Sequence, residues 1–178
     1  MKTFVGKTVI EIASGDITEY EVDAIATPTS PELSMGPGVA GALKRVGGDA
    51  VEAEAMLQGP VEPGAAVVTT GHDLKAHWVI HTAVMTPDLQ TDAGLVAKAT
   101  SSALAKADSA HARSLAMPAF GTGVGGFPIY QCASIMVAET VRYLRDHPRS
   151  GLRRLVFVTY TDAARAAFTN ALAGISRF

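Results

Sequence analysis

Two glycine-rich segments hold the residues best suited to chemistry in this chain of 178 residues. They cover residues 35–42 and 121–128, and each leads into a helical pattern. Glycine lets the backbone approach a ligand and adopt positive φ, while the start of a helix offers unpaired N–H donors and a partial positive charge. The two segments therefore predict a phosphate cradle built from main-chain amides. The alternative is that each segment is only a tight turn.

Two further side chains are suited to binding a nucleoside. Asp16 follows an expected strand, and its carboxylate could accept a hydrogen bond from an exocyclic amine such as that of adenine. A turn or helix cap is the alternative role for Asp16. Tyr160 ends the last expected strand and offers an aromatic face for a base, with a core-edge tyrosine as the alternative.

The second glycine segment also fits a dinucleotide motif. Gly121, Gly123 and Gly126 match G-x-G-x-x-G, so a Rossmann-type NAD(P)-binding oxidoreductase is a distant alternative. The motif lies late in the chain rather than after the first strand. The acidic residue expected about 20 positions later, at the end of the next strand, is missing. Both observations count against a dehydrogenase.

The histidines and the cysteine give little support for a metal site or a catalytic nucleophile. His77 and His81 lie on an expected strand, where they would be about 13 Å apart and too distant to share one metal ion. We expect structural roles for both and no metal site, although His81 could still face the ligand because its strand ends near the site. Cys132 lies inside an expected helix and is interpreted as a small core residue rather than a nucleophile.

The elements that would position these residues alternate between β-rich and helical patterns. Strands are expected at 7–14, 22–26, 65–70, 78–83, 115–119 and 155–160. Helices are expected at 39–46, 49–57, 92–110 (capped by Thr91), 129–146 (with Pro128 at the first position) and 163–172 (ended by Gly174). This order predicts a mostly parallel sheet with helices on both faces, in which the first strand could pair antiparallel at an edge. Such sheets bind ligands outside the carboxyl ends of their strands.

Composition indicates one folded domain spanning residues 1–178, because 48% of the residues are hydrophobic and 18% are charged. The net charge of -2 gives no overall attraction to nucleic acid or membranes. Five arginines nevertheless cluster around His147, and we interpret them as a solvated helix end and turn. They could contact the phosphates of a modified nucleic acid only if they share a face with the ligand site. They are Arg142, Arg145, Arg149, Arg153 and Arg154.

Cysteine usage and hydropathy lead to an expected cellular location. Cys132 is the only cysteine, so no internal disulfide can form, as suits a reducing compartment. No apolar run approaches the ~18–20 residues of a membrane span, and the N-terminus lacks the pattern of a signal peptide. We expect a cytoplasmic monomer without a membrane partner.

Taken in order, these features resemble the macrodomain family. The matching stretches cover nearly the whole chain and are residues 15–18, 22–25, 36–43, 63–71, 78–81 and 117–128. The resemblance implies an α/β fold, a three-layer α/β/α sandwich with a mixed, mostly parallel sheet. It also implies ADP-ribose as the ligand, with no cofactor required.

The resemblance further assigns a role to each part of the ligand site. It implies that Asp16 binds the adenine amine, that Ile17 contributes a backbone contact and that Tyr160 stacks on adenine. Phe127 and residues 27–30, including Thr27 and Ser30, would lie near the distal ribose. Both glycine loops would hold the diphosphate through Gly36, Gly38, Val39, Ala40, Gly121, Thr122, Gly123, Val124, Gly125 and Gly126.

The chain departs from the family at the positions linked to catalysis. Many members carry Asn-Ala-Ala-Asn where this chain has Thr-Pro-Thr-Ser at 27–30, so Ser30 replaces the catalytic asparagine of typical hydrolases. Their loop aspartate corresponds to Ala40 and the aromatic residue of their second loop to Gly125. Residues 82–88 lack the nucleophilic lysine of another branch. Catalytic residues are therefore unassigned, with Ser30 and Gly125 as candidate positions.

Hydrolysis does not require a titrating side chain. A water held between the ligand diphosphate and the backbone could be activated by the substrate itself. We therefore expect ADP-ribose binding together with hydrolysis of mono-ADP-ribose from a protein carboxylate or a nucleic-acid base. The alternative is a non-catalytic reader of ADP-ribosylated protein or nucleic acid.

Overall fold

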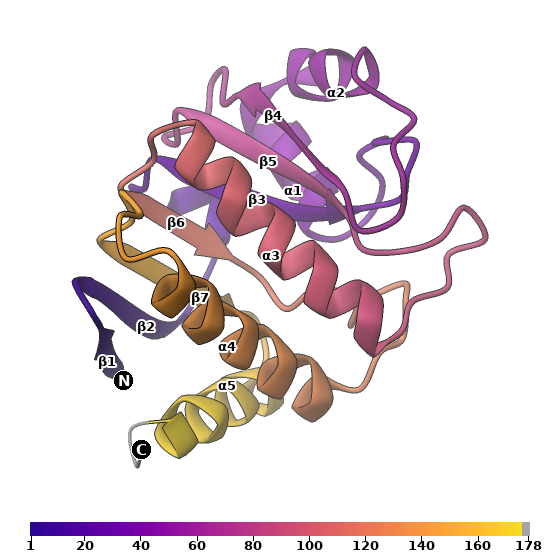
Figure 1. Cartoon of the computed structure of the whole chain (residues 1–178). Coiled ribbons are helices and arrows are strands. Elements are labelled where there is room, and N and C mark those ends of the chain that lie inside the picture. Colours follow the sequence, from indigo (N-terminus) through magenta and orange to yellow (C-terminus); the bar gives the residue numbers. More distant parts are fainter. Residues whose placement is uncertain (176–178) are drawn as a thin grey trace.

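The computed structural model describes residues 1–175, which form one sheet with helices on both of its faces (Figure 1). The strands are β1 (Lys2–Val5), β2 (Thr8–Ser14), β3 (Ala24–Thr29), β4 (Ala66–Thr70), β5 (Trp78–Ala83), β6 (Ser114–Met117) and β7 (Arg154–Thr159). The helices are the 3-10 helix η1 (Ile17–Glu19), α1 (Val39–Gly47), α2 (Asp49–Met56), α3 (Ala93–Ser109), α4 (Ile129–Asp146) and α5 (Asp162–Ile175).

The seven strands follow the order β1-β2-β7-β6-β3-β5-β4. Neighbouring strands from β2 to β5 pair in parallel, whereas β1 and β4 pair antiparallel with β2 and β5 at the two edges. The expected mixed, mostly parallel sheet of an α/β/α sandwich is thus confirmed. The order differs from the 3-2-1-4-5-6 order of the dinucleotide-binding fold, which removes the dehydrogenase alternative.

Helices α3, α4 and α5 cover one face of the sheet, and α1 and α2 cover the other (Figure 1). The larger core joins α3, α4 and α5 to the sheet around buried Leu104, Met136 and Phe168. A smaller core lies beneath α1 and α2 around Leu43 and Val51. Alternate residues of each central strand enter the two cores because successive side chains point to opposite faces.

The edge strand β1 differs from the single N-terminal strand that the pattern predicted. Residues 2–5 form a separate strand, and Gly6, with φ of 58°, makes the turn into β2. It is therefore β1, and not residues 7–14 alone, that supplies the antiparallel edge. Strand β3 also runs three residues beyond its predicted end, through Pro28. Proline fits here because β6 pairs only with Ala24 and Ile25, so one side of β3 has no ladder at Pro28.

The structure corrects three further predictions, each about a residue at the end of a helix. Asp92, not Thr91, caps α3, because its carboxylate accepts a hydrogen bond from the Leu95 amide. Pro128 is the cap of α4 and precedes its first helical residue. Gly174 does not end the last helix, since α5 continues to Ile175.

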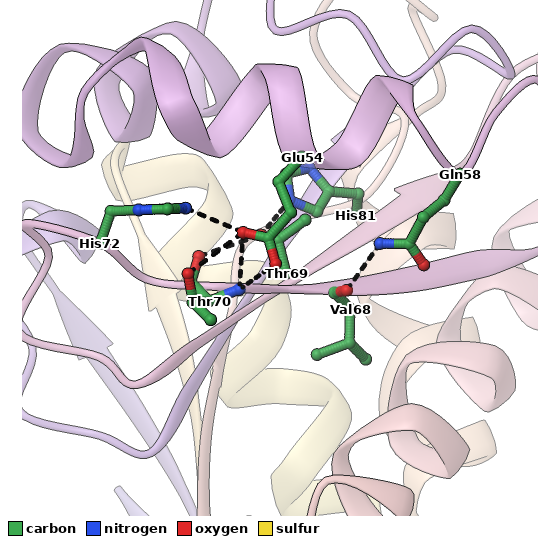
Figure 2. Close-up of polar contacts among 7 residues, drawn as sticks. All are labelled: Glu54, Gln58, Val68, Thr69, Thr70, His72 and His81. Carbon is green, nitrogen blue, oxygen red and sulfur yellow. Dashed lines mark hydrogen bonds and ion pairs between the residues drawn. The ribbon is translucent and has the colours of Figure 1, made fainter.

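Side chains from α2 and the turn that follows it cover the free edge of β4 (Figure 2). The Gln58 side-chain amide donates a hydrogen bond of 2.8 Å to the Val68 carbonyl. The Glu54 carboxylate accepts from the Thr70 amide at 3.2 Å and pairs with the His72 ring at 2.8 Å. Backbone groups that a further strand would use are therefore partly occupied by side chains.

Candidate functional site

Four parallel neighbours, β2, β7, β6 and β3, end at the same edge of the sheet. Asp16 follows β2 and Tyr160 follows β7, while the loop after β6 and the loop after β3 lead into α4 and α1. The fold thus brings together the two glycine loops and the two nucleoside-binding candidates. We call this the carboxyl edge.

The loop from β3 to α1 is tied to the body of the protein. Leu33 is fully buried despite a positive φ of 64°, and the Met35 amide donates to the Glu52 carboxylate at 2.6 Å. Lys44 pairs with the same carboxylate at 2.8 Å. The hydrogen bonds from Lys44 and then from Met35 hold the pKa of Glu52 below its ordinary value. Glu52 therefore stays charged and orders the loop, a role that sequence reasoning missed.

The first turn of α1 presents unpaired amides beside this loop. The first helical hydrogen bond runs from the Ala42 amide to the Gly38 carbonyl at 3.0 Å. Within residues 1–175, no acceptor is assigned to the amides of residues 38–41, as expected at a helix start. A Cβ on Gly41 would lie 2.3 Å from the Gly36 carbonyl oxygen. Glycine at position 41 therefore lets the loop pack directly on the helix.

The loop from β6 to α4 folds back on itself. The Phe127 amide donates to the Gly121 carbonyl at 2.9 Å, and the Gly126 amide donates to the Gly123 carbonyl at 3.0 Å. Gly121 and Gly126 have φ of 75° and 63°, which favours glycine. In the described part of the chain, the amides of residues 122–125 have no assigned acceptor. The loop thus offers a second set of donors next to the first, because β6 and β3 are neighbours.

The open side of the second loop is defined by its glycines. A Cβ on Gly123 would meet no atom within 4 Å, whereas one on Gly125 would lie 2.8 Å from the Gly121 carbonyl oxygen and 3.0 Å from the Thr91 methyl group. Thr91 is fixed by a 2.6 Å hydrogen bond to the Val84 carbonyl. Thr91, predicted as a helix cap, instead supports this loop from the β5–α3 connection.

The nucleoside candidates lie at the ends of adjacent strands. The Gly15 amide bonds to the Thr159 carbonyl at 3.1 Å and so joins the end of β2 to that of β7. Asp16 is exposed, and its Oδ1 accepts hydrogen bonds from the amide and hydroxyl of Thr18 at 2.9 and 2.8 Å. Tyr160 is 94% exposed, so its ring face is available for stacking. Ile17 is buried, which leaves only its backbone for a ligand contact.

The residues expected near the distal ribose differ in accessibility. Ser30, directly after β3, and Phe127 are half-buried, and Val124 at the tip of the second loop is exposed. Thr27 is fully buried within β3, because the strand extends beyond its predicted end. The Thr27 side chain therefore lies beneath the carboxyl edge rather than on its surface.

A row of buried polar side chains runs across β3, β5 and β4 under α2. His81 is fully buried, pairs in register with Thr27 on β3, and contacts the Thr69 hydroxyl through Nε2 at 2.9 Å (Figure 2). Burial lowers the pKa of His81 from the ordinary value of 6.5 to about 4, although nearby Glu54 opposes the shift. His81 is therefore a neutral core residue and does not face the ligand.

The cysteine and the two histidines differ in burial. Cys132 is buried, its thiol lies 3.2 Å from the Phe120 carbonyl oxygen, and burial raises its pKa to about 12. His77 is exposed just before β5, whereas His81 is buried. Among residues 1–175, no group of three or more His, Cys, Asp or Glu side chains is placed to hold a metal ion. The same residues include no helix with the length and apolar character of a membrane span.

The arginine cluster lies at the opposite edge of the sheet. Arg153 and Arg154 precede or begin β7, and Arg145 and Arg149 lie at the end of α4 and in the following turn. The cluster therefore does not share an edge of the sheet with the two glycine loops. Arg142 pairs with Glu139 and Asp146, and Arg154 pairs with Glu11.

Comparisons with known proteins agree with this architecture. A family model described as Macro domain matches residues 26–136. An uncharacterized protein of Mycobacterium bovis is 40% identical over 163 residues, which cover 92% of this chain. The match covers 44% of the mycobacterial protein, so this chain corresponds to less than half of that relative.

Solved structures show the same fold. A point mutant of the Oceanobacillus iheyensis macrodomain, solved with ADPR, superposes with a TM-score of 0.90, at 23% identity over 100% of this chain and 99% of the other. The Trypanosoma brucei macrodomain in complex with ADP-ribose gives a TM-score of 0.84, at 26% identity over 92% of this chain and 68% of the other.

Proposed function

The chain belongs to the macrodomain family, and from that premise we propose that it binds ADP-ribose at the carboxyl edge of its sheet. The observation that carries the proposal is the pair of adjacent loops with unpaired amides at residues 38–41 and 122–125. Amides at a helix start suit a diphosphate through both hydrogen bonds and the helix dipole. The Trypanosoma brucei neighbour, solved with ADP-ribose, supports the same ligand.

We propose the following division of the ligand among the surrounding residues. The free oxygen of Asp16 accepts from the adenine amine, the Ile17 backbone adds a contact, and Tyr160 stacks on the base. The distal ribose lies toward Ser30 and Phe127, with Thr27 supporting this segment from below. The diphosphate contacts backbone at Gly36, Gly38, Val39, Ala40, Gly121, Thr122, Gly123, Val124, Gly125 and Gly126.

Calorimetric titration with ADP-ribose tests the binding proposal. We expect wild-type protein to bind ADP-ribose and Gly123→Glu to abolish binding, because the new carboxylate would point into the open side of the second loop. Gly174→Glu is the matched control, since Gly174 is exposed near the end of α5 and its Cβ would also meet nothing. Absence of binding in the wild type, or equal binding by Gly123→Glu, would contradict the proposal.

Slow hydrolysis is the second part of the proposed function. A water beside the distal ribose attacks the anomeric carbon, its proton passes to a diphosphate oxygen, and the bond to the leaving carboxylate or base breaks. Ser30 and Gly125 line this region, yet neither supplies a general base. Orientation by the backbone and polarisation by the substrate would therefore provide the rate enhancement.

Mono-ADP-ribosylated peptides and oligonucleotides distinguish a hydrolase from a reader. Release of free ADP-ribose is followed by chromatography, with Gly123→Glu as the inactive control. We expect product in proportion to the concentration of wild-type protein. Tight binding of both substrates without product above a no-protein control would establish the reader function instead.

A further inference from the structure

A basic cavity of about 280 Å³ lies at the edge of the sheet opposite the carboxyl edge. The β1–β2 turn forms one wall, and the end of α4 with the turn that follows forms the other. Its lining includes four basic side chains: Lys7, Arg145, His147 and Arg153. Arg149 lies between Pro148 and Ser150, which also line the cavity. We call these five the basic rim.

The basic rim is not neutralised by the protein. Within residues 1–175, the carboxylates that form ion pairs contact other cations, and no Asp or Glu lines the cavity. The nearby Asp108 is occupied by the Tyr143 hydroxyl at 2.7 Å and by the Ser150 hydroxyl and Gly151 amide at 2.8 and 3.0 Å. Asp146 lies toward Arg142 at 3.9 Å. The positive charges of Lys7, Arg145, Arg149 and Arg153 are therefore available to an external anion.

Two members of the rim are already held in place. One terminal nitrogen of Arg153 donates to the carbonyls of Ser150 and Leu152, both at 2.9 Å, which leaves its other nitrogens for a ligand. His147 stacks on Tyr143 with ring centroids 4.0 Å apart, and its Nδ1 contacts the Tyr143 carbonyl at 2.9 Å. The other ring nitrogen, Nε2, has no assigned partner in the described residues. The guanidinium of Arg153 is therefore a fixed donor, which reduces the ordering cost of binding an anion.

An exposed aromatic ring lies on the edge strand that forms part of the cavity wall, but on the opposite face of the sheet. Phe4 is 73% exposed on the edge strand β1 and directly precedes Val5, which lines the cavity. Because side chains alternate along a strand, the Phe4 ring extends from the other face of this edge. Single-stranded nucleic acid is bound through phosphate contacts in cationic grooves and through stacking of its bases on exposed aromatic rings. A strand that passes over the β1 edge would meet the basic rim on one face and the Phe4 ring on the other.

We propose that the basic rim and Phe4 bind single-stranded nucleic acid, with phosphodiesters in the cavity and a base on the ring. This surface is separate from the carboxyl edge by about 20 Å, the length of β2. It therefore requires no ADP-ribose on the nucleic acid. Occupation of one edge leaves the other accessible.

Fluorescence anisotropy with a labelled 20-nucleotide thymidine strand tests the proposal. In about 50 mM salt, we expect Arg145→Ala/Arg149→Ala to weaken binding about tenfold or more. The slope of log affinity against log salt should become shallower by about 1.4, because about 0.7 is lost per phosphate contact on a single strand. Lys98→Ala/Arg165→Ala is the matched control, since it removes equal charge from α3 and α5 and should change affinity less than about twofold.

Phe4→Ala tests the stacking part. We expect about tenfold weaker binding of the strand, with no change for Leu57→Ala, whose side chain is also exposed. Excess ADP-ribose should not displace the strand. No binding by wild type, equal weakening by both double variants, displacement by ADP-ribose, or equal competition by a glutamate polymer would each overturn the proposal. Thermal unfolding of every variant verifies that it is folded.

Discussion

Replacement of the buried His81 should change how stability depends on pH. The imidazole is fully buried, with Thr69, Thr27 and Glu54 as the polar groups around it. Burial lowers its pKa in the folded protein to about 4, whereas the unfolded chain has the ordinary value of 6.5. Between these pH values the unfolded chain binds a proton that the folded protein does not. The free energy of unfolding therefore falls as pH falls.

The size of this effect follows from the two pKa values. One pKa unit corresponds to about 1.4 kcal/mol. The difference between pKa values of 6.5 and about 4 therefore lowers the free energy of unfolding by about 3 kcal/mol once the pH is below both values. About 2 kcal/mol of this should already be lost at pH 5. His81→Gln keeps a polar side chain beside Thr69 but cannot titrate. We therefore expect the variant to lose about 2 kcal/mol less than the wild type between pH 7.5 and 5.

Urea unfolding at pH 7.5 and pH 5.0, followed by circular dichroism and by fluorescence of the single tryptophan Trp78, measures this difference. Between pH 7.5 and pH 5.0 most carboxylates stay ionised, so they contribute little to the change in stability. His77→Gln is the control, because His77 is exposed four residues away and should leave the pH dependence unchanged. If His81→Gln and wild type lose equal stability on acidification, His81 is not held neutral by burial and the reasoning is wrong.

Three other predictions concern the site and the core. Asp16→Ala should weaken ADP-ribose binding by about 1–3 kcal/mol in calorimetry, as for a lost charge-assisted hydrogen bond; an unchanged affinity would remove Asp16 from the site. Gly125→Ala should weaken ADP-ribose binding and lower the thermal stability, because its Cβ would displace the loop from the Gly121 carbonyl and Thr91. Gly123→Ala is the control for stability, because its Cβ would meet no atom within 4 Å. Thermal unfolding and calorimetric titration compare the two variants. Cys132, with its pKa raised to about 12, should react with a thiol reagent such as dithionitrobenzoate only after unfolding, and rapid reaction of the native protein would contradict its burial.

The layers and the two loops could be predicted from the sequence because they rest on local signals. Alternation of apolar residues indicates strands, and glycines before helices indicate exposed amides. The predicted start of a helix was wrong where two neighbouring residues could both serve as its cap. Thr91 and Asp92 are adjacent and both can cap a helix, and only the folded chain shows Asp92 bonding Leu95 and Thr91 bonding Val84.

Other features depended on contacts that no local pattern contains. Glu52 orders the first loop through Met35, 17 residues away, so its role required the placement of α2. Thr27 was expected near the distal ribose but its side chain is fully buried, because β3 continues to Thr29 instead of ending at residue 26. The sequence shows that the arginines around His147 are close together. Only the sheet topology shows that they lie at the edge opposite the glycine loops.

The side chains that α2 and its following turn place along β4 have a consequence for self-association. An uncovered strand edge is a template on which a second molecule can add a strand. Here Gln58 and Glu54 occupy the Val68 carbonyl and the Thr70 amide, so an approaching strand would have to displace these side chains before it could form its own ladder. The side chains of α2 and its following turn should therefore hinder edge-to-edge association of the folded protein through β4.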